Sequence, residues 1–120
     1  MELEQEVAIL DDDPVSCMLL EHVLQSDGLV PRRFSVPEEF LEYMKSHRPA
    51  CVLLDMNMPG MSGLDVQVKL QEMGCTSPVI FVTAEADVAT ATAVFNNGAS
   101  NFIPKPINPS EVLRLIREAA

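Results

Sequence analysis

The sequence predicts an α/β fold in which a parallel sheet is covered by helices on both faces. Three observations support this class. Short apolar runs alternate with stretches of helical periodicity five times along the chain, which is the order of a βα repeat. The run at 50–54 (ACVLL) is apolar throughout, as expected for a strand buried on both faces. With 120 residues, 48% of them hydrophobic, the chain suits a single domain, which we place at 1–120.

The first strand and helix are predicted from their boundaries. Glu6–Leu10 (EVAIL) is an apolar run that ends before three aspartates. A helix is expected over 14–25, because Asp13 can cap its first turn and Pro14 suits its first position. Gly28 ends this element. The apolar residues with helical spacing in it are Val15, Met18, Leu19 and Val23.

The second strand is predicted at the edge of the sheet. Val30–Phe34 contains Pro31 and two arginines, which suit an edge better than a centre. A helix follows over 37–46, with Ser35 or Val36 near its cap. Its apolar face is formed by Phe40, Tyr43 and Met44.

The second half of the chain continues the alternation. The third strand, 50–54, leads through Asp55 and a loop into a helix over 63–73. The fourth strand, 78–82, ends before Thr83 and is followed by a helix over 87–97 that Gly98 ends. The short fifth strand, 101–103, leads into Pro104-Lys105-Pro106. The last helix is capped by Asn108, and its apolar stripe consists of Val112, Leu115, Ile116 and Ala119.

Polar residues gather where these strands end. In open parallel sheets the ligand lies beyond the carboxyl ends of the strands. Those ends carry Asp11-Asp12-Asp13, Asp55, Thr83 and Lys105. We therefore expect these groups to share one edge of the sheet.

Three of these carboxylates suggest a cation site. At an effective dielectric near 20, two carboxylates about 4 Å apart repel by roughly 4 kcal/mol, so a cluster of Asp11, Asp12 and Asp55 needs neutralisation. Oxygen ligands favour Mg²⁺ over zinc. Taken alone, however, Asp11 and Asp12 are equally well explained as cap or loop residues, an explanation that suits Asp13 well.

Asp55 is a candidate nucleophile, because a carboxylate can attack phosphorus and form an acyl phosphate. Lys105 could neutralise the phosphoryl oxygens, and the Thr83 hydroxyl could donate to them. Singly, each has a plainer explanation: a turn cap, a strand end and a solvated lysine. Their joint arrival at successive strand ends favours chemistry. Gly60 and Gly63 would allow the backbone to turn close to Asp55. The sequence leaves open whether the Lys105–Pro106 bond is cis.

Charge and cysteine content exclude several classes of protein. A net charge of −10, from 18 acidic and 8 basic side chains, argues against binding nucleic acid or an anionic membrane. No apolar run approaches the roughly 18–20 residues of a membrane span, and no secretory signal is seen, so we expect a cytoplasmic location. Cys17, Cys51 and Cys75 lack a C-x-x-C pair, which argues against a disulfide scaffold or a zinc site.

Four segments together resemble the receiver domains of two-component response regulators. They are VAILDDDP (7–14), VLLDMNMPGMSGLD (52–65), VIFVTA (79–84) and GASNFIPKP (98–106). The resemblance covers essentially the whole chain, and D-x-x-M-P-x-M-x-G together with the terminal K-P is specific. It implies a flavodoxin-like receiver fold, a doubly wound five-stranded parallel sheet of order 2-1-3-4-5 flanked by five helices.

The same resemblance implies roles at the acidic edge. Asp55 would be the phospho-acceptor of a bacterial two-component system. Asp11 and Asp12 would be the acidic pair that holds Mg²⁺, with Asp12 the more direct ligand and Mn²⁺ as a substitute. Asn57 would offer its backbone carbonyl to the metal, and Lys105 would pair with the phosphoryl group.

The remaining implied roles concern signal output. Thr83 would bond the phosphoryl group and Phe102 would be the switch aromatic, where many relatives have tyrosine. Asn57 and Glu85 would set the lifetime of the phosphoryl group. The expected partners are a histidine kinase or a histidine phosphotransfer protein, and an output domain or protein. A homodimer formed on phosphorylation stays open, as does whether the chain stands alone or belongs to a larger regulator.

Two other functional classes are weighed against this one. A haloacid-dehalogenase-type phosphatase also uses a nucleophilic aspartate, Mg²⁺ and a lysine, but its D-x-D-x-[TV] motif would need aspartate at position 57, where this chain has Asn57. The second class is a receiver-like binding module that works without phosphorylation. The intact acidic pair, acceptor, threonine and lysine argue against it. We therefore expect a switch that catalyses only its own phosphoryl transfer and dephosphorylation, not an enzyme acting on other substrates.

Overall fold

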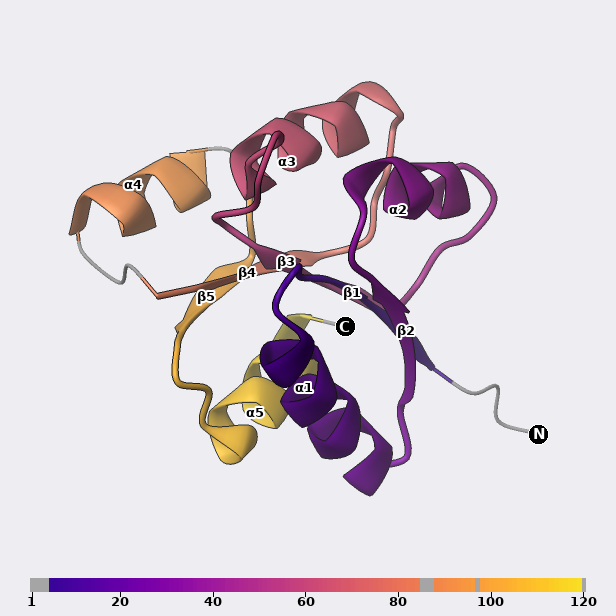
Figure 1. Ribbon diagram of the computed structural model, residues 1–120, viewed down its shortest axis with the longest axis vertical. Helices are drawn as coiled ribbons and strands as arrows, with labels where there is room; N and C mark the ends of the chain where they lie inside the picture. The colour runs from indigo at the N-terminus through magenta and orange to yellow at the C-terminus, as the bar shows by residue number, and fades with distance from the viewer. Residues whose placement is uncertain (1–4, 85–87, 97, 120) are drawn as a thin grey trace.

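The computed structural model describes residues 5–84, 88–96 and 98–119, which form a central parallel sheet with helices on both faces (Figure 1). The strands are β1 (Glu6–Leu10), β2 (Val30–Phe34), β3 (Cys51–Asp55), β4 (Val79–Thr83) and β5 (Asn101–Pro104). The helices are α1 (Pro14–Ser26), α2 (Pro37–Met44), α3 (Gly63–Glu72), α4 (Val88–Asn96) and α5 (Pro109–Ala119). The strand order is β2-β1-β3-β4-β5, which confirms the predicted fold class and order.

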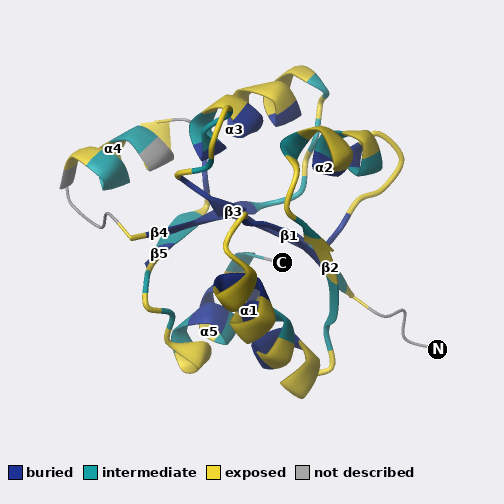
Figure 2. Cartoon of the chain, in the orientation of Figure 1, coloured by how far each residue is buried: buried dark blue, intermediate teal, exposed yellow. Residues whose placement is uncertain are grey.

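The sheet is buried at its centre and more exposed at its edges, β2 most of all. Every residue of β3 and β4 is buried, whereas β2 exposes Arg32 and Arg33 (Figure 2). The prediction that the strand with two arginines forms an edge is therefore confirmed. Each neighbouring pair runs parallel, so the carboxyl ends of the strands lie at the same edge.

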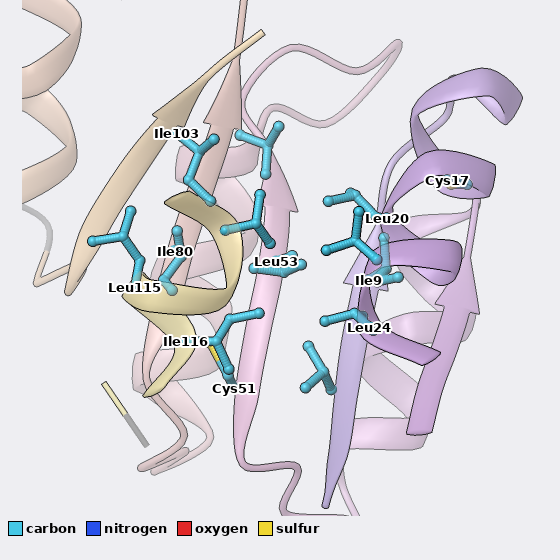
Figure 3. Packing of buried hydrophobic residues seen from close by; sticks show 14 residues of the cluster. Ile9, Cys17, Leu20, Leu24, Cys51, Leu53, Ile80, Ile103, Leu115 and Ile116 are labelled. Atoms are coloured by element: carbon cyan, nitrogen blue, oxygen red, sulfur yellow. The ribbon is translucent and has the colours of Figure 1, made fainter. Parts of the chain in front are cut away.

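Alternating side chains of the sheet build two cores. Val7 and Ile9 of β1 face α1 and α5, where they join Leu20, Leu53 and other residues (Figure 3). The intervening β1 residues point to the opposite face, which α2 and α3 cover. This is the burial expected of a doubly wound sheet, in which each strand is apolar on both faces. The predicted stripe of α5 is also confirmed, since Val112, Leu115 and Ile116 are buried and Ala119 packs against them.

The predicted apolar face of α1 is wrong for three of its four residues. Val15, Met18 and Leu19 are 63%, 66% and 51% exposed, and only Val23 of that set is buried. The residues that α1 buries are Ser16, Cys17, Leu20, Val23 and Leu24. Both sets have helical spacing, because this helix is apolar on two sides, so periodicity alone could not select the buried one.

Smaller differences concern the ends of elements. The second helix ends at Met44 instead of residue 46, and its cap position is Val36, which makes no side-chain capping bond. The third helix ends at Glu72 instead of residue 73. The predicted ends of the fourth helix, 87 and 97, lie outside the described residues. Among the described residues, no helix has both the length and the apolar character that crossing a membrane requires.

Candidate functional site

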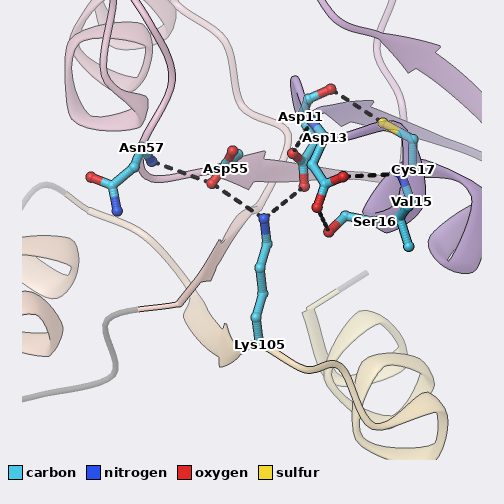
Figure 4. A network of polar contacts seen from close by, with 8 residues as sticks. All are labelled: Asp11, Asp13, Val15, Ser16, Cys17, Asp55, Asn57 and Lys105. Carbon is cyan, nitrogen blue, oxygen red and sulfur yellow. Dashed lines mark hydrogen bonds and ion pairs between the residues drawn. The ribbon is translucent and has the colours of Figure 1, made fainter.

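The candidate site is built from residues at the carboxyl ends of four strands. Asp11 directly follows β1, and Asp55 and Thr83 are the last residues of β3 and β4. Lys105 directly follows β5 and extends its side chain toward Asp11 and Asp55 (Figure 4). The parallel strands thus bring together side chains that lie up to 94 positions apart, from residue 11 to residue 105.

Three aspartates form the acidic part of this site. Carboxylate oxygens of Asp11, Asp12 and Asp55 all lie within 4.8 Å of one another. Asp11 and Asp55 are 1% and 4% exposed, whereas Asp12 is exposed. Within the described part of the chain, Asp11 Oδ2 is a buried oxygen that accepts no hydrogen bond. A buried carboxylate oxygen that is ion-paired but accepts no hydrogen bond, beside two more carboxylates, fits a hard divalent cation such as Mg²⁺.

The Lys105 ammonium lies between the two buried carboxylates. Its Nζ is 3.3 Å from Asp11 Oδ2 and 3.7 Å from Asp55 Oδ1. At these distances it forms ion pairs with both groups without a short hydrogen bond to either. The Lys105–Pro106 peptide bond is cis, which answers the question the sequence left open.

Burial and charge set the protonation of these groups. Burial of Asp55, together with the nearby Asp11 charge, raises the pKa of its carboxyl from 3.8 to about 7, although Lys105 opposes this rise. Burial works to lower the pKa of the Lys105 ammonium, but the charges of Asp11 and Asp55 outweigh it, so that this pKa is raised. Lys105 therefore stays charged at neutral pH, and Asp55 is poised between its two protonation states.

Neighbouring groups hold the carboxylates in place. The Asn57 backbone N–H donates to Asp55 Oδ1 at 3.3 Å, and the Asp13 N–H donates to Asp11 Oδ1 at 2.9 Å. The Cys17 thiol donates to the Asp11 carbonyl at 3.2 Å. Sequence reasoning used Cys17 only to argue against a disulfide scaffold or a zinc site. Its position six residues after Asp11, one turn into a helix capped by Asp13, is the signal that could have placed it here.

A glycine lets the loop after β3 approach Asp55. A Cβ atom added to Gly63 would lie 2.3 Å from the Asp55 carbonyl oxygen and 2.9 Å from Met56 Cα. Gly60 adopts a left-handed φ of 82° in the same loop. The expected turn close to Asp55 is confirmed for Gly63, whereas Gly60 supplies a left-handed turn without a close contact.

The two predicted switch residues lie on the neighbouring strands β4 and β5. Thr83 is fully buried, and its carbonyl accepts a 2.7 Å hydrogen bond from the Lys105 N–H. Phe102, in β5, is half-buried against the core on the α2–α3 face. Glu85, predicted to affect phosphoryl lifetime, lies outside the described residues. Asn57 is exposed next to Asp55.

Comparison with known proteins identifies this arrangement. The model of the response regulator receiver domain matches residues 7–117. The chain belongs to the response regulator receiver family. Among curated proteins, this receiver is 38% identical to the response regulator protein TodT of Pseudomonas putida F1, over 94% of the chain and 50% of that protein. It is 34% identical to the DNA-binding transcriptional regulator NtrC of Escherichia coli K12, over 94% of the chain and 24% of that protein.

Solved structures agree with this assignment. The receiver is similar to the CheY-like response regulator receiver domain protein of Methanospirillum hungatei JF-1, with a TM-score of 0.88 and 25% identity. The similarity covers 97% of this chain and 93% of that one. The receiver spans about half the length of the TodT relative and a quarter of NtrC. Because the chain matches the receiver family, it is not assigned to the haloacid-dehalogenase class that was weighed from the sequence.

Proposed function

We propose that the chain works as one receiver domain over residues 1–120 and accepts a phosphoryl group on Asp55. The observation that carries this proposal is the position of Lys105, whose ammonium lies 3.3 Å from Asp11 and 3.7 Å from Asp55. A buried carboxylate beside a fixed cation and two further acidic groups is suited to accept a group that arrives with negative charge. Membership in the receiver family supports this function.

The metal would be held by residues of the acidic cluster. The carboxylates of Asp11, Asp12 and Asp55 and the backbone carbonyl of Asn57 would bind Mg²⁺, with Mn²⁺ as a substitute. When bound, the cation neutralises charge on the transferring phosphoryl group and orients it. The cluster of three carboxylates within 4.8 Å supports this assignment.

The chemistry at Asp55 is a transfer between two covalent partners. An ionised Asp55 oxygen attacks the phosphorus of a phosphohistidine, the bond from phosphorus to the histidine nitrogen breaks, and an aspartyl phosphate forms. The donor is a histidine kinase or a histidine phosphotransfer protein, or a small phosphodonor in solution. Lys105 stabilises the charge on the phosphoryl oxygens from the side of β5, and hydrolysis of the acyl phosphate later restores Asp55.

The output follows from Thr83 and Phe102. The Thr83 hydroxyl bonds the new phosphoryl group, and its movement lets the Phe102 ring turn inward. Thr83 is tied to Lys105 by a 2.7 Å backbone hydrogen bond, so the ends of β4 and β5 respond together. The resulting change in the α4–β5–α5 surface controls an output domain or partner protein, or homodimer formation. Asn57 and Glu85 set how long the phosphoryl group lasts.

The cellular location of this switch and its lack of nucleic-acid and membrane binding are also part of the proposal. We place it in the cytoplasm of a bacterium, without direct binding to nucleic acid or membrane. The net charge of −10 supports the lack of nucleic-acid binding by this domain. The chain spans about half the length of the TodT relative. By analogy with such longer relatives, we propose that the receiver acts on an output domain.

Labelling by acetyl phosphate tests the proposal. Incubation with acetyl phosphate and Mg²⁺ should add one phosphoryl group, seen by intact mass, and Asp55→Asn should abolish it. Glu72→Gln is the matched control, because Glu72 is an exposed carboxylate at the end of α3. Normal labelling of Asp55→Asn would refute the assignment. A wild type that neither labels nor responds to beryllofluoride with Mg²⁺ would favour the phosphorylation-independent binding module.

A further inference from the structure

Phe102, the proposed switch residue, has an aromatic partner on the neighbouring helix. The rings of Phe102 and Phe95 meet edge to face, with centroids 6.1 Å apart and planes inclined by 72°. This is a favourable geometry for two aromatic rings, whose positive edges and negative faces attract. The pair joins β5 to α4, two elements that lie next to each other in the fold (Figure 1).

The location of Phe95 is unusual for a large apolar side chain. Its side chain is 48% exposed. Its helix, α4, contains no charged residue over Val88–Asn96. Among the described residues, its ring contact is with Phe102 of β5. Phe102 contacts both the core of the α2–α3 face and the Phe95 ring.

A phenylalanine at the switch position needs such a contact. A tyrosine could hold its outward position through a hydroxyl hydrogen bond, but Phe102 has no polar atom on its side chain. Its backbone is held by the Phe102 N–H, which donates to Asn101 Oδ1 at 2.8 Å. Neither this bond nor the pairing of β5 with β4 involves the ring, so the direction of the ring is left to apolar contacts.

We propose that Phe95 is a positioning residue that holds the Phe102 ring in its half-buried position, against α4, in the unphosphorylated protein. Phosphorylation of Asp55 then draws Phe102 inward, separates the two rings and leaves Phe95 without its partner. This inference rests on the proposed phosphoryl switch and adds the residue that sets its resting balance. Because the pair is present in one state only, removing it shifts the balance toward the inward state.

The size of the shift follows from the strength of aromatic pairs. Loss of one edge-to-face pair corresponds to roughly a 2- to 12-fold change in an equilibrium constant. Ligands that favour the inward state should bind more tightly by up to the same factor, since binding and conformation are linked. Phe95→Ala and Phe95→Leu both remove the ring, and Phe95→Tyr keeps it.

Beryllofluoride, a mimic of the phosphoryl group, is the probe for the test. Its apparent dissociation constant is measured in excess Mg²⁺ for the wild type, the three Phe95 variants and Val68→Ala. Val68 is the matched control, because it is an apolar α3 residue that is 44% exposed. In parallel, 4-fluorophenylalanine gives one ¹⁹F resonance for each of the five phenylalanines, and Phe102→Leu assigns that of Phe102.

We expect Phe95→Ala and Phe95→Leu to bind beryllofluoride roughly 2- to 12-fold more tightly. Before the ligand is added, their Phe102 resonance should already be shifted toward its saturated position. Phe95→Tyr and Val68→Ala should match the wild type in both measurements. Should the alanine variant not fold, the leucine variant carries the comparison.

Two different failures can be told apart. Wild-type affinity and an unshifted Phe102 resonance in Phe95→Leu, or weaker binding, would overturn the role of Phe95 while leaving the phosphoryl switch intact. A wild type without any Mg²⁺-dependent response to beryllofluoride would overturn the proposed function, and the role of Phe95 with it.

Discussion

Asp55 combines two properties that conflict in an ordinary carboxylate. As a nucleophile it must be ionised, yet it is 4% exposed and lies beside the Asp11 carboxylate, and both conditions favour the protonated form. Lys105 opposes this tendency from 3.7 Å away. With its pKa raised to about 7, Asp55 is readily ionised once a further cation enters the pocket.

The raised pKa of Asp55 predicts a pH-dependent stability. In metal-free protein, the folded state keeps a proton on Asp55 between pH 3.8 and about 7 that the unfolded state has lost, so stability falls as pH rises through this window. Asp55→Asn has no ionisable group at this position, so its stability does not fall in this way. Its free energy of unfolding should exceed that of the wild type by about 1–3 kcal/mol at pH 8, and by much less at pH 5.

Urea unfolding in EDTA at the two pH values measures this difference. Glu72→Gln, an exposed carboxylate of α3, serves as the control and should show no comparable gain. An equal advantage of Asp55→Asn at pH 5 and pH 8 would contradict the origin of the effect in Asp55 ionisation.

Lys105 should affect metal binding and phosphoryl transfer in opposite directions. Its ammonium repels any divalent ion that enters between Asp11 and Asp55, so Lys105→Met should raise the affinity for Mg²⁺ by about 3- to 10-fold. The same variant should label more slowly with acetyl phosphate, because the charge that stabilises the phosphoryl oxygens is gone. Calorimetric Mg²⁺ titration and intact mass give the two values. Lys69 is an exposed lysine of α3, and Lys69→Met should change neither value. Weaker Mg²⁺ binding by Lys105→Met would show that the Lys105 ammonium does not oppose the metal.

At the scale of elements, capping could be predicted where the capping side chain was visible in the sequence. Asp13 caps α1 by accepting from the Val15 N–H at 3.0 Å, and Asn108 accepts from the Glu111 N–H at 3.2 Å. The capping box of Ser62 and Asp65 at the start of α3 was not predicted, although S-x-x-D is visible in the sequence.

The buried face of α1 could not be predicted, for a physical reason. Cys17 and Leu20 point into the core, while Met18 and Leu19, directly beside or between them in sequence, point to solvent. Hydrophobic periodicity ranks faces by their apolar content, and here two faces score alike. The choice depends on how α1 meets β1 and α5, which is information about tertiary packing.

The loop between β3 and α3 separates two roles of glycine. Gly63→Ala would place a methyl group 2.3 Å from the Asp55 carbonyl oxygen, so the backbone that carries the acceptor must move. We expect a loss of at least about 2–3 kcal/mol in unfolding free energy and slower labelling of Asp55. A Cβ atom at Gly60 would have no atom within 4 Å, so Gly60→Ala should lose only about 1 kcal/mol of unfolding free energy, for the left-handed φ of 82°. Labelling of Asp55 should be largely kept. Urea unfolding and acetyl phosphate labelling compare the two, and equal losses in both assays would contradict the distinction.

At the scale of the whole molecule, the parallel sheet explains why the site could be predicted so fully. Regular βα alternation places every strand end on one edge, so Asp11, Asp55 and Lys105 had to converge once the fold was known. What the sequence could not give was the contact pattern within that edge: the Lys105 ion pairs to both carboxylates and the ring pair of Phe95 and Phe102. These depend on side-chain directions that several elements set together.

The acidic pocket also predicts how Mg²⁺ changes the stability of the whole domain. A cation that binds only the folded state should raise the free energy of unfolding by about 2.7 kcal/mol at 100 times its dissociation constant, and the midpoint of thermal unfolding rises with it. Part of any salt effect is general screening of the net charge of −10, so the reference is NaCl of equal ionic strength.

Asp12→Asn separates the specific effect of Mg²⁺ from screening. Asp12 is exposed and lies within 4.8 Å of two buried carboxylates, so removing its charge should slightly stabilise the metal-free protein. The same change removes a ligand and should abolish most of the stabilisation by Mg²⁺. Glu72→Gln alters the net charge equally and should keep that stabilisation in full. The measurement is thermal unfolding of the wild type, Asp12→Asn and Glu72→Gln in MgCl₂ and in NaCl. If Mg²⁺ stabilised Asp12→Asn as much as the wild type, the cation would bind elsewhere.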